Sequence, residues 1–231
     1  MVTDFVGYED RHGRRVHVRP DTELEDWATW PAPARRPHPG GYAKQCCSHV
    51  FPNGCVGRLV CHGTTTRAAG DILGLGTILA ATALTGQSAT ALAVARATSW
   101  PEPPDYFEHV MFANGSCTAP EAVALSRSTG RALVPNDLRP GYPPAVRFYF
   151  DWMDHASRDD ARFDGVHPVK IKDRLDLDSC LIAVVIAASE RNAVKDVLNA
   201  FAPRLVVLDL QDPTPAAWAH AALQAAEELH S

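Results

Sequence analysis

Apolar residues recur along this chain in short runs, and amphipathic stretches separate these runs. The clearest run is 145–152, AVRFYFDW, in which one face carries Val146, Phe148 and Phe150 and the other carries Arg147, Tyr149 and Asp151. An alternation of period two is typical of a strand. A continuous apolar run at 181–187, LIAVVIA, predicts a fully buried strand.

Weaker patterns predict the other elements. We expect further strands at 56–62, 106–112, 167–172 and 204–210. We expect helices after a cap at Thr64, Thr65 or Thr66, at 120–128 with Gly130 at its end, at 190–201 and at 215–230. The Ala-, Leu- and Thr-rich stretch 72–97 predicts two helical segments, or one kinked helix, buried against a sheet. These elements indicate an α+β fold with a mixed, mainly antiparallel split sheet and flanking helices.

The N-terminal region differs from the rest of the chain. Residues 1–45 begin with charged residues and end in the Pro- and Gly-rich stretch WPAPARRPHPGG, which cannot continue a helix. We interpret 1–45 as an extension or arm and 46–231 as a single α+β domain. The stretch 72–97 is interrupted at Gly86, so neither half is long enough to span a bilayer, and we expect no membrane partner.

Composition and charge limit the cellular compartments and partners that we expect for this protein. Of 231 residues, 46% are hydrophobic and 21% are charged, and the formal net charge is −5, which gives no general attraction to phosphate backbones. The start MVTDFVGYEDRHGRR lacks the apolar core of a signal peptide. We therefore expect a cytoplasmic protein with reduced thiols.

The most chemically suggestive segment follows the first predicted strand. His62, Gly63, Thr64 and Thr65 stand where this strand meets a helix. A glycine lets a ligand approach the backbone closely, and free amides at a helix start favour an anionic or polar group. His62 is placed to hydrogen-bond a ribose or phosphate oxygen; the alternative is that its ring simply caps a neighbouring carbonyl.

The segment LVCHGTTTRAAGDILGLG resembles the opening motif of the ADP-ribosyltransferase superfamily, in which a strand ends in His-Gly-Thr or His-Gly-Ser before a helix. In that family the histidine holds the adenosine-side ribose of NAD and the small hydroxyl residue supports the same pocket. The resemblance implies an ADP-ribosyltransferase-like fold and NAD as the substrate. It assigns His62, Gly63 and Thr64 to the NAD site, with Thr65 beside them.

The aromatic strand 145–152 is similar to one in the DNA-modifying DarT-like branch of the same superfamily. In the superfamily a tyrosine stacks on the nicotinamide ring, so the resemblance implies that Tyr149 stacks there. An arginine beside an aromatic residue also suits contacts with the pyrophosphate and the ring, which makes Arg147 a candidate for the same site. The alternative is an edge strand with one half-solvated face. The functional reading requires His62 and Tyr149 to face one another across a common crevice.

Two acids are candidates for the catalytic carboxylate. Glu108 lies among aromatic residues in the predicted strand 106–112, where it serves catalysis or pairs with an arginine such as Arg147. The family places an acid near a late strand, to hold the nicotinamide ribose and stabilise an oxocarbenium ion. This chain has no glutamate there, and Asp178 comes nearest by position.

Four cysteines crowd into sixteen residues, at 46, 47, 55 and 61, close to His49 and His62. Their spacing lacks a standard zinc knuckle, so we expect thiols and no metal, with a small zinc-stabilised protein as an alternative.

Our leading hypothesis is an NAD-dependent ADP-ribosyltransferase that acts on a protein or nucleic-acid acceptor. The alternatives are a non-catalytic NAD- or nucleotide-binding module and an NAD glycohydrolase.

Overall fold

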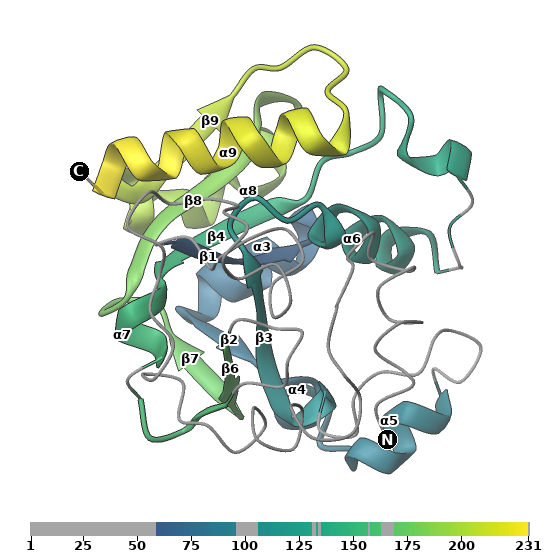
Figure 1. Ribbon diagram of the computed structural model, residues 1–231, viewed down its shortest axis with the longest axis vertical. Coiled ribbons are helices and arrows are strands. Elements are labelled where there is room, and N and C mark those ends of the chain that lie inside the picture. The colour runs from purple at the N-terminus through teal and green to yellow at the C-terminus, as the bar shows by residue number, and fades with distance from the viewer. Residues whose placement is uncertain are drawn as a thin grey trace, which may run out of the picture. The chain divides into compact units, whose positions relative to one another are not determined.

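The computed structural model describes residues 59–95, 106–130, 133, 135–156, 158–162 and 169–230. The arm expected at 1–45 and the cysteines at 46, 47 and 55 lie outside the described residues. The chain divides into two compact units, each built from several segments. The first unit comprises Met1–Val60, Ile78–Asn114 and Asp151–Leu175; the second comprises Cys61–Thr77, Gly115–Phe150 and Asp176–Ser231. The elements are labelled in Figure 1.

The second unit contains a run of neighbouring strands, β1, β4, β8 and β9, in that order. Their bounds are Leu59–Thr64, of which Cys61–Thr64 belong to this unit, Val146–Asp151, Leu181–Ala187 and Leu205–Leu208. β4 pairs antiparallel with β8, and β8 pairs parallel with β9. The continuous apolar sequence of β8 suits its interior position, because both of its faces are covered.

The helices of the second unit are α3 (Thr66–Leu75), α6 (Ala119–Thr129), α8 (Arg191–Leu198) and α9 (Pro215–His230), with 3-10 turns η4 (Pro135–Leu138), η5 (Ala188–Glu190) and η6 (Asn199–Arg204). α9 lies along β8 and β9 (Figure 1). Its Trp218 is fully buried and donates its indole N–H to the carbonyl of Ala145 at 3.0 Å. This contact joins the C-terminal helix to the start of β4.

The first unit contains β3 (His109–Asn114), β5 (Ala161–Arg162) and β6 (Val169–Lys172), in the order β5-β6-β3 with antiparallel pairing. Its helices are α4 (Ala81–Thr85), α5 (Ala89–Ala95) and α7 (Trp152–Ala156), with a 3-10 turn η3 (Tyr106–Glu108). The aromatic ring of Phe112 meets the His155 ring of α7 edge-on, with centroids 5.4 Å apart. A separate two-stranded sheet pairs β2 (Thr77–Leu79) with β7 (Arg174–Asp176).

Most of the predicted elements are confirmed. The strand 181–187 and the helix 215–230 have the expected bounds, and the mixed α+β class with mainly antiparallel pairing and flanking helices is confirmed. α3 is capped as expected, since the Thr65 hydroxyl accepts the Ala68 amide at 3.2 Å and Gly76 ends the helix at a φ of 65°. Gly130 likewise ends α6 in the left-handed region.

Two predictions are wrong. The stretch 72–97 is not a buried helical pair, because β2 interrupts it and α4 has no buried residue; Leu84 is 66% exposed. The strand expected from Tyr106 begins only at His109, because Tyr106–Glu108 form a 3-10 turn. This turn is held by the buried Phe107, whose carbonyl accepts the Thr82 hydroxyl at 3.1 Å.

Candidate functional site

The His62-Gly63-Thr64 motif forms the end of β1, and the structure shows which way its side chains point. Cys61 is buried, with its sulfur 3.5 Å from Nη1 of Arg147. A Cβ placed on Gly63 would lie 2.3 Å from Cβ of Pro120 in α6. Positions 61 and 63 therefore face Arg147 and α6. Because alternate residues of a strand point to opposite faces, His62 and Thr64 point to the other face.

The four residues of the motif differ in exposure and in local role. His62 is half-buried, whereas Thr64 is 2% exposed. The Thr65 hydroxyl is used by the helix itself, as the N-cap of α3. The sequence did not reveal why position 63 is a glycine. Only a residue without a side chain leaves room there for Pro120.

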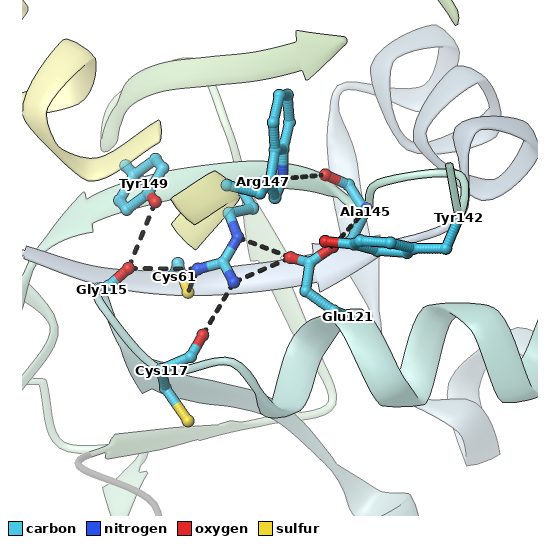
Figure 2. A network of polar contacts seen from close by, with 9 residues as sticks. Cys61, Gly115, Cys117, Glu121, Tyr142, Ala145, Arg147 and Tyr149 are labelled. Carbon is cyan, nitrogen blue, oxygen red and sulfur yellow. Dashed lines mark hydrogen bonds and ion pairs between the residues drawn. The ribbon is translucent and has the colours of Figure 1, made fainter. Parts of the chain in front are cut away.

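Arg147 is fully buried, and its guanidinium is bound entirely by protein groups. Its Nε donates to Oε1 of Glu121 at 2.9 Å, and Nη2 lies 2.8 Å from the same oxygen. Nη1 donates to the carbonyl of Gly115 at 3.1 Å and Nη2 donates to that of Cys117 at 2.7 Å. Figure 2 shows the guanidinium in the middle of these groups, between β4 and α6. A buried charge is tolerated only when it is paired and hydrogen-bonded in this way.

Glu121 is the carboxylate that pairs with Arg147, the role for which the sequence offered Glu108. It is fully buried, and its Oε2 accepts the Ala145 amide at 2.7 Å and the Tyr142 hydroxyl at 3.4 Å. Burial raises the pKa of Glu121, and the Arg147 guanidinium opposes that rise. Burial alone would lower the pKa of Arg147, but Tyr149, Cys61 and Glu121 keep it well above its usual value.

Tyr149 lies beside Arg147 in the same network. It is fully buried, and its hydroxyl donates to the Gly115 carbonyl at 3.2 Å, so one carbonyl accepts from both Tyr149 and Arg147 (Figure 2). Burial raises the pKa of the Tyr149 phenol, and burial together with Glu121 raises that of Tyr142. Both tyrosines are therefore neutral hydrogen-bond donors at ordinary pH.

The structure thus places Arg147 and Tyr149, the two residues of β4 expected to contact NAD, in the protein core. Neither side chain has an accessible surface, and their polar groups are hydrogen-bonded to the protein. β4 is also not an edge strand, since it lies between β1 and β8. His62 points away from the face that carries Arg147 and Tyr149, so the two rings at 62 and 149 do not share a crevice.

The two candidate acids lie at element boundaries. Asp178 is exposed in the turn before β8, where its main-chain carbonyl accepts Nη1 of Arg204 at 3.1 Å. Glu108 is half-buried at the end of η3 in the first unit, and its main-chain carbonyl accepts the amide of Asp173 at 2.9 Å. Its expected place inside a regular strand is wrong, because Tyr106–Glu108 form a 3-10 turn and the strand begins only at His109.

Sequence reasoning missed Glu121 and the carbonyls of Gly115 and Cys117. An acid in the first turn of a helix is ordinarily explained by the helix dipole, so nothing in APEAVAL singles out Glu121 as a core residue. The available signal was the run of small apolar residues around it, Ala119, Pro120 and Ala122, which suits a buried helix turn.

The environment of Cys61 keeps its thiol unreactive. Burial raises the pKa of Cys61 to about 12, so its thiol stays protonated. Cys117 is also buried and Cys180 is half-buried, and none of the three is in a disulfide. Within the described ranges, no three His, Cys, Asp or Glu side chains are grouped to hold a metal ion. The other members of the cysteine cluster lie outside those ranges.

None of the helices in the described part of the chain is both long and apolar enough to cross a membrane. Comparison of the chain with protein-family models, with curated proteins and with solved structures finds no match.

Proposed function

We propose that this chain binds NAD at the His62-Gly63-Thr64 motif and transfers its ADP-ribose to a protein or nucleic-acid acceptor. This proposal gives up the requirement that His62 and Tyr149 share a crevice, because Tyr149 is fully buried, and it rests on the motif alone. One observation carries the proposal. The motif has the local structure that its resemblance to ADP-ribosyltransferases implies, a strand that ends at Thr64 followed by a helix capped by Thr65 and ended by Gly76. The ADP-ribosyltransferase-like fold is part of this proposal.

In this proposal His62 is the residue that meets NAD. It is half-buried, points away from the buried Arg147 network, and comes directly before a close-packed glycine, so its ring is held on a rigid strand. Its imidazole hydrogen-bonds the ribose hydroxyls on the adenosine side. Thr64 beneath it is buried and supports the shape of the site.

The reaction breaks the bond between the ribose C1′ and the nicotinamide nitrogen. Nicotinamide leaves with the bonding electrons, positive charge develops on the ribose, and a carboxylate stabilises that charge. The acceptor then forms the new bond to C1′ and gives up its proton. Asp178 and Glu108 are the candidate carboxylates, and only mutation separates them.

A second function is favoured by a specific observation. The chain has no glutamate near the late strand, where the resemblance implies a catalytic acid, and this favours a nucleotide-binding module without turnover. With water as the acceptor, the same chemistry would give an NAD glycohydrolase.

The test is to incubate the purified full chain with NAD and measure both binding, by calorimetry, and nicotinamide release, by chromatography. We expect His62→Ala to weaken NAD binding at least tenfold and His220→Ala, an exposed histidine on α9, to leave it unchanged. Binding without release identifies the non-catalytic module, and free ADP-ribose without an acceptor identifies the glycohydrolase. Absence of binding rejects NAD as the ligand.

If nicotinamide is released, the acid is assigned by Asp178→Asn and Glu108→Gln, with Asp209→Asn as an exposed control. Loss of the catalytic carboxylate should lower kcat at least a hundredfold with little change in NAD binding, because its charge acts mainly in the transition state.

A further inference from the structure

We propose that Arg147 is a positioning residue, which holds the segment Gly115–Thr118 and the start of α6 against β1 and so sets the position of His62. The inference rests on the proposed function in one respect, that His62 is where NAD binds. The sequence suggested that Arg147 contacts NAD directly. In the present proposal Arg147 acts indirectly, through the position of His62.

The contacts of Arg147 reach three separate parts of the second unit. From β4, its guanidinium donates to the carbonyls of Gly115 and Cys117, at 3.1 and 2.7 Å, in the segment before α6. It binds Glu121 in the first turn of α6 at 2.8 Å. It also lies 3.5 Å from the sulfur of Cys61 on β1, next to His62. Figure 2 shows these groups converging on one side chain.

The start of α6, which Arg147 binds, also packs against the His62-Gly63-Thr64 motif. Pro120, the residue before Glu121 in α6, packs closely against Gly63. A Cβ added to Gly63 would stand 2.3 Å from the Cβ of Pro120. Cys61 and Gly63 flank His62 in β1. The position of His62 is therefore bounded on both sides by residues that touch Arg147 or the helix that Arg147 holds.

The chemistry requires arginine at this position. A guanidinium presents several N–H donors in a fixed plane and binds a carboxylate and two carbonyls together. A lysine ammonium has one nitrogen on a flexible stem and cannot reach Glu121, Gly115 and Cys117 with comparable geometry. The Tyr149 hydroxyl, which donates to Gly115 at 3.2 Å, is the only other side-chain donor to this segment within the network drawn in Figure 2.

The test compares Arg147→Lys with Trp218→Phe in the full chain. Trp218 is equally buried and its indole donates to the carbonyl of Ala145, so its replacement also lowers stability. Its indole is linked to Glu121 only through Ala145, whose amide donates to Glu121, and this bond does not involve the segment or the motif. Arg158→Met, in an exposed ion pair with Asp160, is the surface control. All variants are studied at a temperature at which circular dichroism shows them fully folded.

Two measurements are made on each variant. Hydrogen exchange of the amides of residues 116–118 should be at least tenfold faster in Arg147→Lys and unchanged in Trp218→Phe. The dissociation constant for NAD should rise at least fivefold in Arg147→Lys alone. Normal exchange of this segment in folded Arg147→Lys overturns the positioning role, and so does unchanged NAD binding.

Failure of the proposed function is recognised separately. If the unaltered chain does not bind NAD, the ligand assignment fails, and hydrogen exchange alone then decides whether Arg147 holds the segment. Should Arg147→Lys not fold, Tyr149→Phe removes one of the two donors to Gly115 while leaving the ion pair in place. It should speed exchange of the 116 amide in the same direction, and an unchanged rate rejects the role.

Discussion

Replacing Gly63 by alanine adds only one methyl group, yet we expect it to destabilise the protein strongly. The new Cβ would stand 2.3 Å from Cβ of Pro120, whereas ordinary contact begins at 3.4 Å, so the two atoms must separate by about 1.1 Å. Pro120 is a rigid ring in the first turn of α6, and the next residue, Glu121, is bound to Arg147. Pro120 therefore cannot move away from β1 without disturbing the buried ion pair between Glu121 and Arg147.

The expected cost follows from this geometry. Overpacking of a well-packed core costs about 1–3 kcal/mol, and we expect Gly63→Ala to lower the free energy of unfolding by about 3 kcal/mol. The backbone of Gly63 is not in the left-handed region, so the effect is steric and contains no contribution from a forbidden φ. Urea unfolding, followed by circular dichroism, measures it.

Gly70→Ala is the matched control. The nearest atom to a Cβ on Gly70 is Cγ1 of Val194 at 3.5 Å, which is ordinary contact, and Gly70 lies inside α3. Alanine in a helix interior is more stable than glycine by about 0.5–1 kcal/mol, so this variant should gain stability. Two identical substitutions seven residues apart should therefore change stability in opposite directions.

A Gly63→Ala variant within about 0.5 kcal/mol of the unaltered protein, the range of innocuous surface changes, would show that β1 and α6 are not in close contact at this point. Removing the opposing Cβ supplies a second check. The double variant Gly63→Ala with Pro120→Gly should recover part of the loss, and no recovery would place the strain elsewhere.

Two further predictions concern the buried network. Arg147→Met should lower the free energy of unfolding by about 3–5 kcal/mol, because it leaves the Glu121 carboxylate buried without its cation. Adding Glu121→Gln should recover part of this loss in urea unfolding. A double variant no more stable than Arg147→Met alone contradicts this expectation. The pKa of Cys61 is raised by burial from 9.0 to about 12, so above pH 9 the unfolded chain loses a proton that the folded protein keeps. Stability should therefore fall by about 1.4 kcal/mol per pH unit from this thiol as the pH rises from 9 toward 12. Cys61→Ala should make the urea midpoint correspondingly less dependent on pH, and an unchanged slope rejects the assignment to this group.

The elements that sequence predicted well are those with local causes. The helix after β1 follows from a threonine cap and a glycine ten residues after its first residue, Thr66. The strand at 181–187 follows from an uninterrupted apolar run, and the C-terminal helix from its amphipathic pattern and its proline start. In each case the residues that determine the structure are close together in the sequence.

The failures have tertiary causes. Tyr106–Phe107–Glu108 have the composition of a strand, but the burial of Phe107 and a hydrogen bond from Thr82 hold them in a 3-10 turn. The stretch 72–97 is apolar enough for a buried helix pair, yet Gly76 ends α3 and β2 pairs with β7. Such pairings join residues far apart in sequence, so local patterns do not reveal them.

The candidate site divides in the same way. The sequence by itself determined the strand-to-helix junction at His62–Thr65 and the alternation of β4, because capping and side-chain alternation act between neighbouring residues. Whether the polar face of β4 meets solvent, a ligand or the core was decided only by the tertiary structure. α6 brings Glu121 onto that face from 26 residues away, and a buried guanidinium must take the carboxylate and carbonyls that reach it. Arg147 thus became part of the core, while His62, on the opposite face of β1, is only half-buried.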